Sequence, residues 1–219
     1  MDNQKTNRRF YHRLLVCLYK AASPSLVKEI PMPRINIAVA GGQCTGKSTL
    51  AAYLFAKLKE QSCDFDLITE QARQLKKEFG GCRNAFDRFY LWRQQEREEL
   101  RSMAEEGFIT DTPLFYLYVS ARQFAQEPRD NLAIRELFRM CLEIKDRYQL
   151  IVMAKNPDEI PYQNDACRVR EKELARTCHK LTRSFVEHFW PERLLLVKGS
   201  VEARAATVLK RLEEMKKAS

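Results

Sequence analysis

The segment from Gly41 to Ser48 has residue types and a spacing that bind phosphate. It consists, in order, of Gly41, Gly42, Gln43, Cys44, Thr45, Gly46, Lys47 and Ser48, and Thr49 follows it. This order fits the pattern G-x-x-x-x-G-K-[ST] at every position. Glycines let backbone N–H groups turn inward around an anion, a lysine at this place reaches the β- and γ-phosphates, and the final hydroxyl ligates Mg²⁺. The segment therefore predicts a site for ATP and Mg²⁺.

The flanking sequence supports this interpretation of the glycine-rich segment. A short apolar strand is predicted at residues 35–40 and an amphipathic helix at residues 47–60. A phosphate loop must lie between a strand and the N-terminus of a helix, where the helix dipole also favours an anion. The alternative is a glycine-rich turn that binds nothing. We prefer the phosphate loop because strand, motif and helix agree.

Asp111 is the second candidate for phosphate chemistry. It follows the predicted strand 108–110 directly. In P-loop proteins a carboxylate at the end of a neighbouring strand holds Mg²⁺, so we assign Asp111 and Ser48 as metal ligands and Asp111 as catalytic beside Lys47. The alternative is that Asp111 only caps a helix that begins at Pro113.

Glu70 and Arg73 are candidates for the acceptor side of the site. Glu70 ends the predicted strand 65–69, so its carboxylate should lie at the same sheet edge as the phosphate loop. There it can bind an acceptor hydroxyl or accept its proton. Arg73, one helical turn on, is placed to contact an anion on the acceptor or to pair with Glu70. The alternative for Glu70 is a glutamate that stabilises a helix N-terminus.

Arg168 and Arg170 follow a polar loop predicted at residues 157–165. Arginines on a segment that closes over ATP neutralise charge during phosphoryl transfer, and we assign Arg168 this catalytic role. The alternative is an ordinary charged helix start.

An aromatic group lies near the start of a long predicted helix at residues 84–106, and it comprises Phe86, Phe89, Tyr90 and Trp92. Such residues stack on a base, although aromatics at helical spacing more often form core. Gln94 is a candidate for reading a base edge.

These residues must be positioned by an alternation of strands and helices. Strands are predicted at residues 35–40, 65–69, 108–110, 150–153 and 193–197. Helices are predicted at residues 47–60, 71–79, 84–106, 113–126, 131–147, 171–189 and 201–217. Short apolar strands separated by helices indicate a parallel sheet covered on both faces, which is an α/β fold.

Composition narrows the class of protein. The chain has 219 residues and an odd number of cysteines, seven, without a C-x-x-C pair, which favours a reducing, cytoplasmic compartment over a disulfide framework. No apolar run has the ~18 residues that a membrane span needs, so no membrane partner is expected. Residues 1–33 are predicted to be a basic helical extension, and residues 34–219 the P-loop domain. No signal specifies an oligomeric state.

The chain resembles small P-loop kinases of the AAA_28 type. The resemblance covers about residues 34–200, and its motifs are residues 41–48, 68–73, Gln94 with Arg97 and Glu98, residues 110–113, and Asp165 with Arg168. This group includes the nicotinamide riboside kinase domain of a bacterial NAD regulator and phage-encoded nucleoside or nucleotide kinases. The resemblance implies a five-stranded parallel sheet with the P-loop NTPase fold, Mg-ATP as donor and a small nucleoside-like acceptor.

Three functions remain open on the sequence. The first is an ATP-dependent kinase that phosphorylates a hydroxyl of a nucleoside or nucleotide. The second is a kinase that acts on DNA, at a 5′-end or a hydroxymethylated base, which would account for the net charge of +9. The third is a nucleotide-binding regulatory ATPase.

Overall fold

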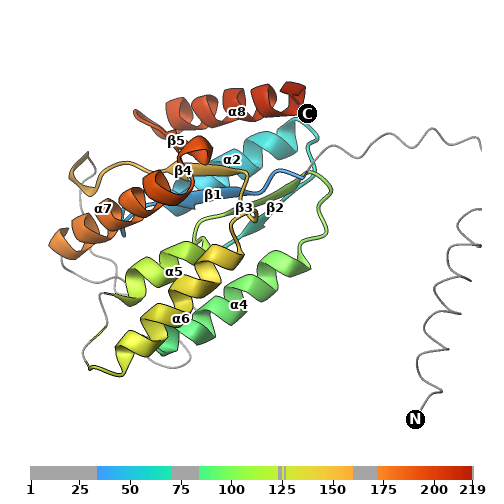
Figure 1. Cartoon of the computed structure of the whole chain (residues 1–219). Helices are drawn as coiled ribbons and strands as arrows, with labels where there is room; N and C mark the ends of the chain where they lie inside the picture. Colours follow the sequence, from blue (N-terminus) through green and yellow to red (C-terminus); the bar gives the residue numbers. More distant parts are fainter. Residues whose placement is uncertain (1–33, 71–83, 123–124, 126, 160–171, 219) are drawn as a thin grey trace, which may run out of the picture. The chain divides into compact units, whose positions relative to one another are not determined.

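A computed structural model describes residues 34–70, 84–122, 125, 127–159 and 172–218 (Figure 1). The strands are β1 (Ile37–Ala40), β2 (Phe65–Ile68), β3 (Gly107–Thr110), β4 (Leu150–Met153) and β5 (Leu194–Leu196). The helices are α2 (Lys47–Glu60), α4 (Asp87–Arg101), α5 (Leu114–Ala121), α6 (Asp130–Glu143), α7 (Lys172–Phe189) and α8 (Val201–Ala218), with short 3-10 turns η1 (Pro157–Glu159) and η2 (Pro191–Arg193). The predicted order of these elements is confirmed.

The strands form one parallel sheet in the order β2-β3-β1-β4-β5. The central strand β1 pairs with β3 on one side, where Ala38 lies opposite Thr110, and with β4 on the other, where Ala40 lies opposite Met153. Since all pairings are parallel, the carboxyl ends of the strands meet at one edge of the sheet. The prediction of a five-stranded parallel sheet with the P-loop NTPase fold is confirmed.

Side chains alternate across the sheet and divide the core in two. Ile37 and Val39 of β1 point to a cluster formed with α2 and α8, whereas Ala38 and Ala40 point to a cluster formed with α4, α5, α6 and α7. Both sets of helices cover the sheet in Figure 1. The period of two along each strand thus gives each face its own layer of helices, as predicted from the apolar runs.

Helix α4 ends earlier than predicted, at Arg101 instead of Glu106. Two aspartates in and before β2 account for the difference. Asp66 Oδ2 accepts hydrogen bonds from Ser102 Oγ at 2.7 Å and Ala104 N at 3.4 Å, and Asp64 Oδ2 accepts one from Glu105 N at 2.7 Å. These bonds draw the chain out of the helix and into the connection to β3.

Several predicted features lie outside the described residues. They are the extension of residues 1–33, the helix predicted at residues 71–79 with Arg73, and Arg168 with Arg170. None of the helices in the described part of the chain is both long and apolar enough to cross a membrane.

Candidate functional site

The predicted phosphate loop joins the central strand β1 to the N-terminus of α2. Gly46, the N-cap residue of α2, has φ 73°, a left-handed conformation that glycine adopts without strain. No side chain among the described residues caps this helix, and its first turn carries no acidic residue. Because the first N–H groups of a helix have no partner within the helix, they can bind an anion together with the helix dipole. The residues therefore fit the phosphates of ATP.

The ammonium group of Lys47 lies against the loop. Its Nζ donates a hydrogen bond to Gly42 O at 2.6 Å and lies 5.2 Å from the centre of the Tyr116 ring. Gly42 O also accepts a bond from Thr45 Oγ1 at 2.9 Å, and Thr45 is fully buried. The loop thus holds the cation at the strand end where the nucleotide phosphates are expected.

Asp111 lies at the carboxyl end of β3, the strand that pairs with β1. Its side chain is only 3% exposed, and Oδ1 accepts a hydrogen bond from Thr112 Oγ1 at 3.4 Å. The N-cap residue of α5 is Pro113, and within the described ranges no side chain caps that helix, so no hydrogen bond seen there favours the capping alternative. Asp111 and Ser48, which is half-buried in the first turn of α2, fit the pair of oxygen ligands that Mg²⁺ takes in such sites.

A buried polar network supports the segment around Asp111. Gln95 Nε2 donates to Thr110 Oγ1 at 3.0 Å, and Thr110 Oγ1 also accepts a bond from Thr112 N at 3.3 Å. These bonds fix the residues on both sides of Asp111. Gln95 is therefore the glutamine that is buried at the end of β3. Its neighbour Gln94, the sequence candidate for reading a base edge, is half-buried.

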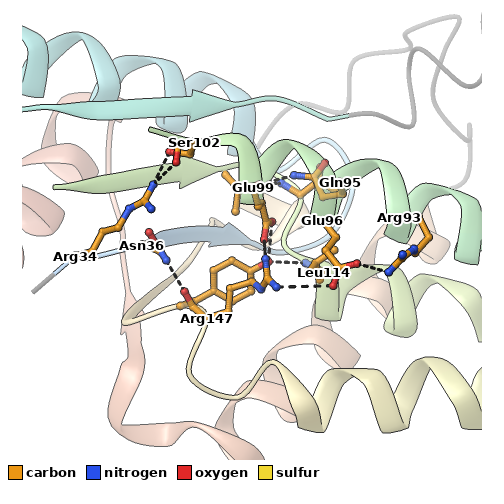
Figure 2. A network of polar contacts seen from close by, with 12 residues as sticks. Arg34, Asn36, Arg93, Gln95, Glu96, Glu99, Ser102, Leu114 and Arg147 are labelled. Carbon is orange, nitrogen blue, oxygen red and sulfur yellow. Dashed lines mark hydrogen bonds and ion pairs between the residues drawn. The ribbon is translucent and has the colours of Figure 1, made fainter. Parts of the chain in front are cut away.

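The same network continues to Glu99, as Figure 2 shows. Tyr148 OH donates to Glu99 Oε1 at 2.8 Å and accepts a bond from Leu114 N at 2.9 Å, so the carboxyl group is linked to the first residue of α5. Arg147 Nη1 lies 3.4 Å from Glu99 Oε2. Burial raises the pKa of the Glu99 carboxyl to about 7, although Tyr148 and Arg147 both oppose the rise.

Glu70 follows β2 by two residues and is half-buried. Its charge acts on Tyr116 in α5. Burial raises the pKa of the Tyr116 hydroxyl well above its ordinary value, the Cys178 thiol and the Glu70 carboxylate raise it further, and Arg88 opposes them. Tyr116 is therefore close to the ammonium of Lys47 and is also affected by the charge of the predicted acceptor-side carboxylate.

The aromatic residues at the start of α4 divide between core and surface. Trp92 is fully buried and Phe89 packs against the core, whereas Phe86 and Tyr90 are 42% and 45% exposed. The core interpretation therefore applies to Trp92 and Phe89. Tyr116 was not predicted, because its place over Lys47 depends on how α5 packs.

A family model described as an AAA domain, AAA_28, matches residues 36–204 of the chain. The chain belongs to the AAA_28 family. This match confirms the resemblance seen in the sequence, and it covers every described residue of the candidate site. No curated protein matches the chain.

Solved structures share the fold of this AAA_28 chain. The NadR protein in complex with NR aligns with a TM-score of 0.62 and 20% identity over 84% of this chain and 51% of its own. A NadR complex with NAD and AMP-PNP gives a TM-score of 0.62 and 19% identity over 84% of this chain and 49% of its own. The chain thus spans about half the length of these proteins. Deoxyadenosine kinase from M. mycoides with bound dATP aligns with a TM-score of 0.60 and 16% identity over 82% of this chain and all of its own.

Proposed function

We propose that this chain is a kinase that transfers the γ-phosphoryl group of Mg-ATP to a hydroxyl of a nucleoside or nucleotide. One observation carries the proposal. The three neighbouring strands β2, β3 and β1 end, in that order, near Glu70, at Asp111 and at the phosphate loop. In-line phosphoryl transfer requires a carboxylate for the acceptor, a carboxylate for the metal and a site for the phosphates, and here these three parts lie in one row.

Each residue has a role in this proposal. Lys47 and the N–H groups of the loop bind the phosphates and stabilise the charge that develops on them, and Ser48 with Asp111 holds Mg²⁺, which neutralises further charge when bound. Glu70 positions the acceptor hydroxyl and accepts its proton. From the sequence, we add Arg73 and Gln94 as acceptor contacts and Arg168 as an arginine that meets the transferring group.

A small acceptor is supported by the ligands of proteins that share the fold. These include NR in a NadR complex and dATP in a deoxyadenosine kinase complex. Among the described residues, no disulfide joins Cys44, Cys63, Cys141 or Cys178. The cysteine pattern of the sequence is the basis on which we propose a reducing, cytoplasmic environment. The second candidate is a DNA kinase, which the net charge of +9 favours.

The test is a transfer screen with γ-labelled ATP over nucleosides, mononucleotides and DNA oligonucleotides, with acceptor-free ATPase activity measured in parallel. We expect label in a nucleoside or nucleotide product and little acceptor-free hydrolysis. Lys47→Ala is the control, and we expect it to remain folded and to lose about 10²- to 10³-fold in rate, as for comparable electrostatic contacts.

The other outcomes of the screen each contradict the proposal. Label in DNA, with binding whose affinity falls steeply with salt, would favour the DNA kinase. Hydrolysis without any acceptor would favour a regulatory ATPase. Full activity of a folded Lys47→Ala variant would refute the phosphate site.

A further inference from the structure

Helix α7 packs directly against the phosphate loop at Gly42. Gly42 N lies 3.4 Å from His179 Nδ1, to which it donates a hydrogen bond. A Cβ atom on Gly42 would lie 2.2 Å from Ala175 O and 3.1 Å from His179 Cβ, so only glycine permits this approach. Ala175 and His179 are four residues apart and therefore share one face of the helix. The phosphate loop is thus held by a helix, α7, that does not belong to the strand-loop-helix unit containing the motif.

Gly42 joins this helix to the catalytic cation. While its N–H group is bound by His179, its carbonyl accepts the bonds from Lys47 Nζ at 2.6 Å and Thr45 Oγ1 at 2.9 Å. The imidazole of His179 therefore binds the N–H group of Gly42, and the ammonium of Lys47 binds the carbonyl group of the same residue. A change in the orientation of Gly42 would move the carbonyl that holds Lys47.

The hydrogen bond requires one protonation state of the ring. A neutral imidazole accepts at Nδ1 only when its proton is on Nε2, whereas an imidazolium donates from both nitrogens and accepts from neither. His179 is 7% exposed. Burial and the positive charges of Lys47 and Arg183 lower its pKa, and the carboxylate of Glu159 opposes them. The ring is therefore neutral at physiological pH and able to accept from Gly42.

We propose that His179 is a positioning residue for the nucleotide phosphates, which fixes Gly42 through Nδ1 and thereby sets the place of the Lys47 ammonium. This inference rests on the proposed function, because it assigns Lys47 to phosphate. A histidine that served only to fill the core would contribute to stability and would not alter affinity for nucleotide separately from it. The two roles therefore give different results when binding and stability are measured on the same variants.

Three substitutions at position 179 separate the acceptor atom from the bulk of the ring. In His179→Asn the side-chain oxygen occupies the place of Nδ1, in His179→Gln it lies one bond further out, and His179→Leu has no acceptor. The affinity of each variant for mant-ATP with Mg²⁺ is measured by fluorescence, together with its melting temperature and the KM for the acceptor found in the screen. His188→Leu, which removes an exposed histidine from the same helix, is the matched control.

We expect the Leu and Gln variants to bind mant-ATP about five- to tenfold more weakly, as for the loss of one hydrogen bond that also orients a charge. We expect His179→Asn to recover most of that affinity and the acceptor KM to change little in all of them. Equal affinity of the wild type and the Leu variant would overturn the proposal, and so would an Asn variant that binds as weakly as Leu at an unchanged melting temperature.

The binding assay needs no acceptor, so the two proposals can fail separately. Mant-ATP binding that follows this pattern in a protein without transferase activity supports the role of His179 and refutes the kinase. Transferase activity together with unchanged mant-ATP affinity in all variants supports the kinase and refutes the role of His179.

Discussion

The buried carboxyl group of Glu99 predicts an unusual dependence of stability on pH. Burial raises the pKa of this group from an ordinary value of 4.5 to about 7 in the folded chain. The folded state therefore holds the proton more tightly than the unfolded state does. The contribution to stability is fully present below pH 4.5 and is lost as the pH rises through about 7. At about 1.4 kcal/mol for each pH unit between the two pKa values, the loss is on the order of 3 kcal/mol.

Glu99→Gln tests this prediction, because glutamine keeps the shape of the protonated acid and its carbonyl can still accept the bond from Tyr148. We expect the free energy of unfolding of the variant, relative to wild type, to increase by about 2 to 3 kcal/mol between pH 5 and pH 8. Urea unfolding at four pH values measures this difference. Glu213→Gln, at an exposed position of α8, is the control and should follow the wild type.

A difference between wild type and Glu99→Gln that stays constant from pH 5 to pH 8 would refute the argument. That result would mean that Glu99 titrates alike in the folded and unfolded chains, and that Arg147 and Tyr148 compensate fully for its burial. The measurement therefore decides between burial and pairing as the dominant effect on this carboxyl group.

Four further predictions concern the site itself. Asp111→Asn should weaken the response of activity to Mg²⁺, whereas Glu70→Gln should keep ATP affinity and lower turnover; identical magnesium titrations or normal turnover would reject these assignments. Alkylation of Cys44, which is half-buried in the loop, should block ATP binding, and Mg-ATP should protect it; peptide mapping that finds equal labelling with and without nucleotide would contradict this. Arg168→Ala should slow single-turnover transfer by at least ~10³-fold at saturating ATP, and a loss below about threefold would exclude the role.

The sequence alone predicted those parts of the fold and site whose cause is local. Helix α2 and strand β4 have the predicted bounds, because an apolar pattern and a glycine motif within a few residues determine them. The end of α4 could not be predicted, since it depends on Asp66, 36 residues away from Ser102 along the chain. The position of Glu70 and Asp111 at one edge of the sheet could be predicted, because both follow strands and the carboxyl ends of parallel strands share an edge.

The unpredicted side chains around the site share a different cause. His179 reaches Gly42 across 137 residues of sequence, and Tyr148 reaches Glu99 across 49. No local pattern encodes such contacts. One signal was present for His179: it stands on the face of α7 that also carries Ala175, Thr182 and Val186, all buried, so a histidine in that stripe was a candidate for an internal polar contact.

The division of the core into two faces bears on how the chain is made. The face of α2 that carries Leu50, Leu54 and Leu58 packs with α8, and α8 begins roughly 150 residues after the start of α2. At about 5–20 residues per second, a ribosome needs on the order of 10 s to synthesise that interval. Throughout that interval the nascent α2 can pack on β1, β2 and β3, but it lacks the part of its cover that α8 supplies. The layer of the core around the helix proposed to bind the nucleotide phosphates is therefore completed only when α8 has been made.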